Sequence, residues 1–552
     1  LEAAQSEVSA IERRIKQEHP SAFQSKDAAV MSLQSHVVGE VRPALLMLFA
    51  AVGFLLLIVC VNVANLLLVR VTARSRELAV RTALGAGRRH LVRLMLSESL
   101  LLAVAGGTAG LLLAVWSLEL LRILLPPEVP RVGDIRIDGG VVAFALAVSA
   151  AAGLLFGFLP AWRACAMNVN DALKSGSRSA TWGRKSYRTQ GALVVSEVCL
   201  SLLLVTGAAL LARSFSYLRT LDPGFRSEGV LTVNASFPPG KKPEVLAKYR
   251  DLRARVGALP GVVAAGTAST IPVGGFHPDG HFFVEGRRAQ MGNADADWIM
   301  VSPGYLKAMR IPLLRGRDFT EQDSENSRPV AVISQEMARV YFPGSDPIGQ
   351  RIWFDSFAPS ELWMTVVGVA GDVRQSSLTQ KSVYPAAYVC YTQQTFLPAL
   401  TGGTLVLRTQ GNPAPLAGAV RSAVRAVNPE SDPTPRTMDA ILAESLARQR
   451  FQMQVLGGFA LLALVLAAVG LYGVLSYLVT ANRPQIGIRL ALGAQPRAVF
   501  RMVTGRALAL AAAGAALGLI GCVALRRVLA SMLFGIGPND PVTIAAAVGA
   551  LL

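Results

Sequence analysis

The chain has 552 residues, of which 52% are hydrophobic and 16% charged, and its formal net charge is +18. This composition excludes a single soluble domain and indicates a membrane protein. The five cysteines are scattered, which excludes a disulfide framework or a Cys-x-x-Cys metal pair. The first residue is Leu1 and no signal peptide follows it, so we expect the N-terminus to be cut rather than native.

The apolar runs predict six membrane-spanning helices and the start of a seventh. About 20 helical residues are needed to cross ~30 Å of hydrocarbon. Runs of this length lie at 45–69, 94–116, 141–160, 192–211, 455–479 and 507–525. A further run begins at Pro541 and stops at Leu552, which is too short to cross, so we expect the C-terminus to be cut as well.

The charges of the short loops predict the orientation of these helices. Loop 70–93 has seven arginines against one acid, and loop 161–190 has six basic residues against one acid, whereas loop 117–140 has three basic residues against four acids. Because Lys and Arg accumulate in cytoplasmic loops, the first two loops are expected inside and the third outside. The polar region 213–452, between the fourth and fifth spans, is then outside.

A ten-residue stretch occurs twice in the chain. Residues 77–86 read Glu-Leu-Ala-Val-Arg-Thr-Ala-Leu-Gly-Ala, and 408 residues later 485–494 read Gln-Ile-Gly-Ile-Arg-Leu-Ala-Leu-Gly-Ala. Under the same offset Arg89 and Arg93 recur, and Gly106 and Gly110 fall on Gly514 and Gly518. Four spans separate the two stretches, so both face the same side. This pattern predicts a duplicated architecture of two parallel units, related by an axis along the membrane normal.

The outside region has the periodicities of a mixed α/β domain. Apolar spacing predicts helices at 244–256 and 335–341, and apolar runs predict strands at 261–265, 330–333 and 364–369. After them, Met438, Ile441, Leu442 and Leu446 form a helical stripe. We expect this stripe to continue into the fifth span as one helix, a stalk that could transmit movement.

These motifs resemble those of the MacB/FtsX class of ABC transporter permeases. The resemblance rests on the repeated stretch, on Gly-Leu-Tyr-Gly-Val-Leu-Ser-Tyr at 470–477 and on Ile-Pro-Leu-Leu-Arg-Gly-Arg-Asp-Phe at 311–319. It covers essentially the whole chain and is most similar to the long bacterial permeases in which two units are fused. It implies that one helix and most of one outer domain precede Leu1. It also implies that the loop between the second and third helices of each unit docks on a cytosolic ATPase subunit.

The expected fold class is an α-helical transmembrane bundle of two parallel FtsX-like units with a large mixed α/β extracytoplasmic domain, in the bacterial inner membrane. The expected segments begin with the tail of a truncated outer domain and stalk at 1–43, followed by three helices of the first unit at 44–163 with coupling loop 70–93. A basic cytosolic linker at 164–190 leads to the first helix of the second unit at 191–213. A MacB-like periplasmic α/β domain at 214–452 follows, and the remaining helices of the second unit are at 453–552 with coupling loop 480–506.

Each coupling loop is expected to carry a short amphipathic helix. An apolar face beside an arginine edge suits a partner groove, and a following glycine can end the helix. The alternative is an interfacial helix whose arginines contact anionic headgroups. The second copy lacks the charge of Glu77, since Gln485 replaces it, so its coupling could be weaker or absent. The candidate docking residues are Glu77, Val80, Arg81, Ala83, Leu84 and Gly85 in the first loop, and Ile488, Arg489, Ala491, Leu492 and Gly493 in the second.

Within the spans, the glycine pairs Gly106/Gly110 and Gly514/Gly518 predict close helix packing. Asn62 and Asn65 are expected to hydrogen-bond to a neighbouring helix, and Glu197 is a candidate for a buried polar contact. Glu98 and Arg506 occupy equivalent positions under the 408-residue offset. They either pair across the pseudo-twofold axis or reach toward headgroups.

The sequence contains no phosphate-binding Gly-x-x-x-x-Gly-Lys-Ser/Thr loop, so ATP and Mg²⁺ are expected on a separate ATPase subunit. His277 and His281 lack a defined third ligand, and no nucleophile turn occurs, so no catalytic, cofactor or metal site is expected. The other expected partners are the lipid bilayer and, as an option, a periplasmic or outer-membrane protein, but no nucleic acid. The favoured function is a permease that couples ATP hydrolysis to motion of its outer domain, for efflux or for mechanotransmission. An orphan scaffold or sensor without an ATPase is the alternative.

Overall fold

The computed structural model describes residues 1–18, 29–33, 39, 42–73, 88–124, 136–165, 180–237, 242–274, 277–287, 294–355, 362–380, 382–393, 402–481, 483–493 and 495–551. The chain forms two compact units. One, the helical unit, contains Leu33–Tyr217 and Arg448–Leu552. The other, the α/β unit, contains Leu1–Ser32 and Leu218–Ala447.

The helical unit consists of long apolar helices in the order that the sequence predicts. They are α3 (Arg42–Ala73), α5 (Arg88–Leu124), α6 (Gly139–Cys165), α8 (Ala180–Thr220), α15 (Ala447–Ala481), α17 (Pro496–Ala530) and the shorter α18 (Pro541–Leu551). Among the described residues, five helices have a segment long and apolar enough to cross a membrane, in α3, α5, α8, α15 and α17. In α6 and α18 the described apolar segments are shorter, at Gly139–Leu155 and Pro541–Leu551. The membrane class is therefore confirmed.

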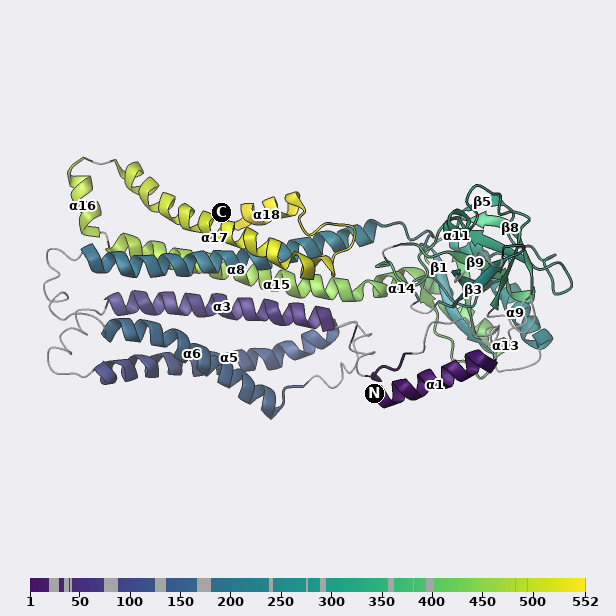
Figure 1. The fold of residues 1–552 in the computed structure, drawn as a ribbon, viewed down its shortest axis with the longest axis horizontal. Coiled ribbons are helices and arrows are strands. Elements are labelled where there is room, and N and C mark those ends of the chain that lie inside the picture. The colour runs from purple at the N-terminus through teal and green to yellow at the C-terminus, as the bar shows by residue number, and fades with distance from the viewer. Residues whose placement is uncertain are drawn as a thin grey trace. The chain divides into compact units, whose positions relative to one another are not determined.

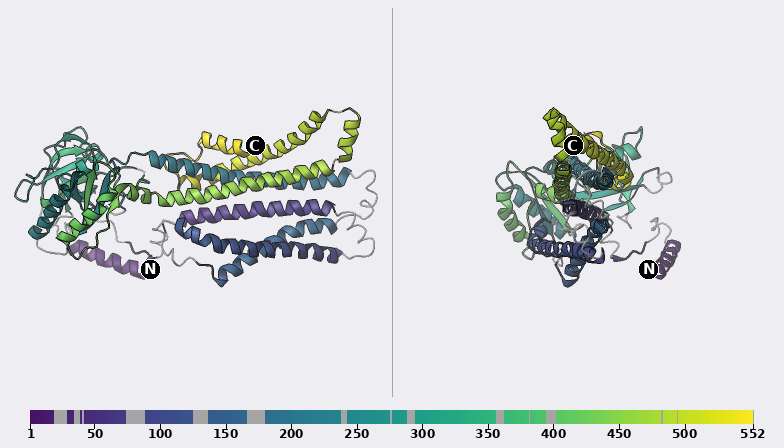
Figure 2. Two further views of the ribbon diagram at one scale, coloured as in Figure 1. Left: turned by 180° about the vertical axis from the view of Figure 1, so that it is seen from behind. Right: turned by 90° about the vertical axis from the view of Figure 1, so that its left-hand side faces the viewer.

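The packing of the helical unit places α8 between other helices. Its apolar core brings together Ile58 of α3, Leu202 of α8, Ala463 of α15 and Ala515 of α17, all of them buried. The ends of α3 and α15 that precede the two repeated stretches lie at the same end of this unit (Figures 1 and 2). The parity of the spans predicts this arrangement.

Two expectations at the borders of the helices are wrong. The stretch 164–190 is not a linker throughout, because α8 begins at Ala180, ten residues before the expected end of the linker. The stalk is not one continuous helix, because α14 (Met438–Ser445) ends before α15 begins at Ala447. Leu446 between them has φ −103° and ψ 2°, which is outside helical geometry. The hydrophobic stripe continues through this break, which is why the sequence alone does not show it.

The α/β unit confirms the mixed α/β expectation. Its strands are β1 (Val230–Ser236), β2 (Val262–Ala268), β3 (Asp279–Val284), β4 (Asp295–Val301), β5 (Leu313–Gly316), β6 (Val330–Ser334), β7 (Arg351–Phe354), β8 (Met364–Ala370), β9 (Ala386–Cys390), β10 (Gly402–Thr409) and β11 (Arg436–Thr437). Its helices include α1 (Glu2–Glu18), α9 (Lys242–Gly257), α10 (Tyr305–Met309), α11 (Gln335–Tyr341) and α13 (Ala417–Val427). The helix predicted at 335–341 is α11, and Ser334 caps it by accepting a hydrogen bond from Met337 N at 3.1 Å.

The strands of this unit form two parts. In the first, β11, β1, β10 and β2 are antiparallel neighbours, with α9 and α13 packed on them. In the second, β4, β3, β7, β8, β6 and β9 are neighbours in that order, and a parallel pairing of β9 with β4 closes the ring. Closure leaves no free edge among these six strands. The side chains inside both parts belong to one buried cluster that includes Leu231, Phe282, Met300 and Val389.

Candidate functional site

The second copy of the repeated stretch forms the short helix α16 (Arg483–Ala491). It runs crosswise to α15 and α17 at one end of the helical unit (Figure 1). Gly493 ends it with φ +88°, a left-handed conformation that glycine adopts without strain, and its N–H donates to Leu490 O at 3.0 Å. Pro496 then opens α17 at a position where the missing N–H costs nothing. The local sequence therefore produces a helix, a turn and a new helix within fourteen residues, 483–496.

The side chains of α16 leave an apolar surface open. Ile488 is 61% exposed and Leu492, in the turn that follows, is 82% exposed. Phe500, one turn into α17, is also exposed. Arg489 turns back onto α17, where Nη1 donates to Met502 Sδ at 3.2 Å. Ala491 is exposed as well. The predicted residues of this copy therefore form one surface with apolar and cationic groups side by side.

The first copy of the stretch cannot be compared in the same way. Glu77, Val80, Arg81, Ala83, Leu84 and Gly85 all lie outside the described residues.

A buried polar contact joins α3 and α8. Asn62 Nδ2 donates to Glu197 Oε1 at 2.6 Å and also to Leu466 O of α15 at 3.0 Å. Glu197 is only 1% exposed and Asn62 only 7%. Ser201, one turn after Glu197, donates to Ala463 O at 3.3 Å and ties α8 to α15. Three helices from distant parts of the chain thus meet around one carboxyl group.

Gly470 makes this contact possible. A Cβ built on Gly470 would lie 2.2 Å from Glu197 Oε2 and 2.3 Å from Asn62 Oδ1. Any larger side chain would displace both groups. Asn65, one turn along α3 and also buried, lines a cavity with Asn62, Leu66, Val469, Gly470 and Gly473 that has room for about one water molecule. Gly470 is the first residue of the 470–477 motif, but the sequence did not predict its contact with Glu197; its equivalence to Asn62 under the 408-residue offset is a signal that could have indicated it.

The two glycine pairs have different surroundings. Gly514 and Gly518 of α17 lie against α8: an added Cβ would be 2.7 Å from Val198 Cβ at Gly514 and 2.9 Å from Leu202 Cδ2 at Gly518. At Gly106 and Gly110 of α5, by contrast, no described atom lies within 4 Å of that position. The close contact of α5 with α6 is made instead by Gly153 and Gly157, which face Ala103 and Ser99. The packing expected at Gly106 and Gly110 is therefore not observed, because α6 lies on another face of α5.

Of the two alternatives for Glu98 and Arg506, pairing across the pseudo-twofold axis is not supported by the arrangement of the helices. Glu98 lies on α5 and Arg506 on α17. These helices lie on opposite sides of the helical unit, with α3 and α8 between them (Figures 1 and 2). A stronger ion pair occurs elsewhere: Arg213 of α8 contacts Asp540, which caps α18 by accepting from Thr543 N at 2.9 Å. Hydrogen bonds to Thr543 and the Arg213 charge lower the pKa of Asp540.

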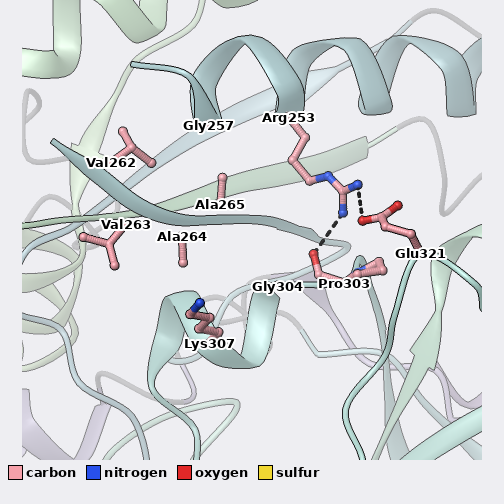
Figure 3. A pocket seen from close by; sticks show the side chains of 10 residues that line it. All are labelled: Arg253, Gly257, Val262, Val263, Ala264, Ala265, Pro303, Gly304, Lys307 and Glu321. Atoms are coloured by element: carbon pink, nitrogen blue, oxygen red, sulfur yellow. Dashed lines mark hydrogen bonds and ion pairs between the residues drawn. The ribbon is translucent and has the colours of Figure 1, made fainter. Parts of the chain in front are cut away.

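In the α/β unit, a hollow of about 330 Å³ lies beside one edge of β2 (Figure 3). Over residues 262–267 this strand pairs with β10, whereas β4 reaches it only at Ala268, so backbone groups near 262–265 face the hollow. Arg253 spans it, with Nη1 donating to Pro303 O at 3.0 Å and Nη2 pairing with Glu321 at 2.5 Å. An open strand edge of this kind can receive an extended peptide.

The histidine pair is engaged by aspartates. His277 Nδ1 lies 2.8 Å from Asp297 Oδ1, and His281 pairs with Asp295 across the β3–β4 register. Burial raises the pKa of Asp297 to about 6, against the opposing effect of His277. Within the described ranges no three His, Cys, Asp or Glu side chains converge to hold a metal ion.

Apolar helices that cross a bilayer, with an α/β unit inserted between α8 and α15, define a multi-pass membrane protein with an extracytoplasmic domain. Comparison with family models gives two matches. The model described as FtsX-like permease C-terminal matches residues 49–169 and 457–552, on either side of the α/β unit, and the model described as MacB-like periplasmic core domain matches residues 198–427. The chain therefore belongs to the MacB/FtsX family of ABC transporter permeases, which are multi-pass proteins of the bacterial cytoplasmic membrane.

Individual relatives match shorter segments. A pyoverdine export ATP-binding/permease protein of Pseudomonas putida is 33% identical over 172 residues, 30% of this chain and 24% of that protein. A macrolide export ATP-binding/permease protein of Chromobacterium violaceum is 36% identical over 131 residues, 24% of this chain and 20% of that protein. An uncharacterized ABC transporter permease of Bacillus subtilis is 35% identical over 113 residues, 20% of this chain and 26% of that protein. The match thus spans about a quarter of each relative's length.

The periplasmic region of MacB from Actinobacillus actinomycetemcomitans aligns with 41% of this chain and 95% of its own, at 15% identity and a TM-score of 0.28.

Proposed function

We propose that this permease works with a separate cytosolic ATPase subunit, which carries ATP and Mg²⁺, and that it couples ATP hydrolysis to motion of its α/β unit. The observation that carries the proposal is the surface of α16, where Ile488 and Leu492 stand exposed at the end of the helical unit. Apolar side chains on a cytosolic helix are costly to leave in water, and a partner groove would bury them.

The charges around α16 favour a protein partner with acidic groups. Arg489, Arg497 and Arg501 lie within and just after this helix, and no acidic residue occurs between 480 and 506. The two copies share three positions on this face, since Val80, Arg81 and Leu84 correspond to Ile488, Arg489 and Leu492. An interfacial helix would also bury apolar positions at the lipid boundary, so the recurrence of these positions in both copies is what favours a partner groove.

We further propose that the matched segments 49–169 and 457–552 are two fused copies of one permease unit. The separate matches of one family model support this, as does the 408-residue repeat. In such an arrangement one full-length chain presents both docking helices and replaces a dimer of single-unit permeases.

The α/β unit is linked to the helical unit by the chain at both of its borders, through α8 and through α14 and α15.

Export is the direction that the relatives favour. Two of them are named as export proteins, one for pyoverdine and one for macrolides. Because those compounds differ, the direction and not the compound is what this chain is proposed to share with them. The same coupling of ATP hydrolysis to motion of the α/β unit would also serve to transmit force to an extracytoplasmic partner, which is the second output that we propose.

The test is co-purification of the full-length protein with its ATPase subunit, combined with ATP turnover in liposomes. Leu492→Asp and Ile488→Asp place a charge on the exposed face of α16 and should reduce ATPase binding at least tenfold. Gln495→Ala is the matched control, because Gln495 is exposed two residues after the turn and makes no side-chain capping bond. Equal binding by all three variants would contradict docking through α16. Purification without any ATPase would favour the scaffold or sensor function instead.

A further inference from the structure

Two buried oxygen atoms in the polar contact around Glu197 lack a hydrogen-bond partner among the described residues. These atoms are Glu197 Oε2 and Asn62 Oδ1. They lie 2.2 Å and 2.3 Å from one point, the position of a Cβ on Gly470, so they are at most 4.5 Å apart. The other oxygen of the carboxyl, Oε1, already accepts from Asn62 Nδ2 at 2.6 Å. Two adjacent acceptors in a buried site repel each other unless a donor lies between them.

A proton on Glu197 resolves this arrangement. A carboxylic acid presents one donor and one acceptor side by side, and so does a primary amide. With Oε2 protonated, Glu197 donates to Asn62 Oδ1 while Asn62 Nδ2 donates to Glu197 Oε1. Both unpartnered oxygens are then satisfied, and no buried charge remains.

No charged neighbour offers another solution in the described part of the chain. Among the described residues, the side chain that hydrogen-bonds to Glu197 is Asn62, which is uncharged. On its own helix the nearby polar residue is Ser201, which is bonded to Ala463 O; on α15 the neighbours are Leu466 O and Gly470, and α17 meets this part of α8 through Gly514. A metal cation is also disfavoured, since Asn62, Asn65 and Glu197 offer few oxygens and the cavity beside them has room for about one water molecule.

We propose that Glu197 is a proton-binding site within the membrane, and that its neutral carboxyl forms a two-point hydrogen bond with Asn62 that holds α3 to α8 against Gly470. The site goes beyond the proposed function and does not depend on an ATPase. It lies where a helix of the first matched segment meets helices that flank the α/β unit. Release of the proton leaves a carboxylate facing an amide oxygen, which loosens this junction. Proton uptake from water restores it.

The test is infrared difference spectroscopy of the full-length protein in lipid vesicles, with the proton as the probe. At neutral pH the spectrum should contain the carbonyl band of one carboxylic acid that is absent from Glu197→Gln. Gln can make both hydrogen bonds to Asn62, so this variant should fold normally. Glu98→Gln, in a different helix, is the matched control and should retain the band. Identical carbonyl regions in wild-type and Glu197→Gln spectra would overturn the proposal.

A second variant keeps the test decisive if Glu197→Gln cannot be purified. Asn62→Leu leaves the acid but removes its amide partner, so the band should shift to the position of a weakly bonded carboxylic acid. A band that does not shift would overturn the proposal. These outcomes are independent of ATPase binding, so failure here and failure of α16 docking are distinguishable.

Discussion

The two matched membrane segments carry equivalent residues that do different things. Gly514 and Gly518 of α17 lie directly on α8, whereas their equivalents Gly106 and Gly110 of α5 face open space among the described residues. In the same way Gly470 of α15 is in contact with Glu197, while its equivalent in α3 is Asn62, the side chain that bonds to Glu197.

The difference lies in α8. This one helix meets α17 through an apolar glycine contact and meets α3 and α15 through the polar contact at Glu197. Equivalence in the repeat therefore fixes neither the neighbour of a position nor, as at Asn62 and Gly470, its residue type. The comparison suggests where each copy is intolerant of substitution, and three predictions test it, from the largest expected effect to the smallest.

Gly470→Ala should cause the largest loss of stability. The added methyl group would lie 2.2 Å from Glu197 Oε2 and 2.3 Å from Asn62 Oδ1, so it must break the buried hydrogen bond as well as overpack the junction. Together these effects are expected to cost about 3 kcal/mol or more. The measurement is the thermal stability of the full-length protein in detergent, followed by size-exclusion chromatography.

Gly473→Ala is the control for this variant. It lies on the same helix, and its added Cβ would meet only Leu66 Cδ2 at 4.0 Å, an ordinary contact. Equal loss by the two variants would show that α15 rejects any side chain there and that the polar contact is not the cause.

Gly514→Ala should have the next largest effect. Its Cβ would lie 2.7 Å from Val198 Cβ and 2.8 Å from the backbone oxygen of Val195, so α17 and α8 would have to separate at a cost of about 1–3 kcal/mol. The equivalent substitution in the other copy, Gly106→Ala, meets no described atom within 4 Å and should leave the melting temperature unchanged. A Gly106→Ala variant as unstable as Gly514→Ala would refute the difference between the two copies.

The smallest effect is expected at the N-terminal caps of α6 and α18, the last helix of each matched segment. This effect should depend on pH. Asp540 caps α18 and contacts Arg213, whereas Asp138 caps α6 by accepting from Val141 N at 2.8 Å. Because the pKa of Asp540 is lowered in the folded protein, its stabilising contribution is present at neutral pH and is lost as the pH falls through that lowered pKa.

Asp540→Asn should therefore lower the melting temperature at neutral pH by a few degrees and have less effect at pH 3. Asp138→Asn removes the charge from a cap of the same local geometry that has no contact to α8, so it should change the melting temperature less. A loss for Asp540→Asn that is the same at both pH values would contradict the role of its charge.

Local sequence was enough to predict the helices, their order and several elements of the α/β unit. The apolar runs are long and uniform, and α11 has a Ser cap at its start, so the residues that fix these elements are close together in the chain. Local sequence failed at Leu446, where the hydrophobic stripe continues through a break in the helix, and at 180–190, where polar residues continue α8. A pattern of side chains reports which face is apolar, but not whether each backbone bond between successive turns is made.

For the candidate sites, too, some features follow from the local sequence and others only from the tertiary structure. The sequence by itself determined the membrane class, the repeat, and the composition of the α16 surface, because these depend on residue type and spacing. Only the tertiary structure showed that Asn62, Glu197 and Gly470 meet at one point and that Gly106 and Gly110 do not share the contacts of Gly514 and Gly518. Contacts between helices far apart in the chain depend on which faces pack together, and that choice is made by the whole set of helices and not by any one of them.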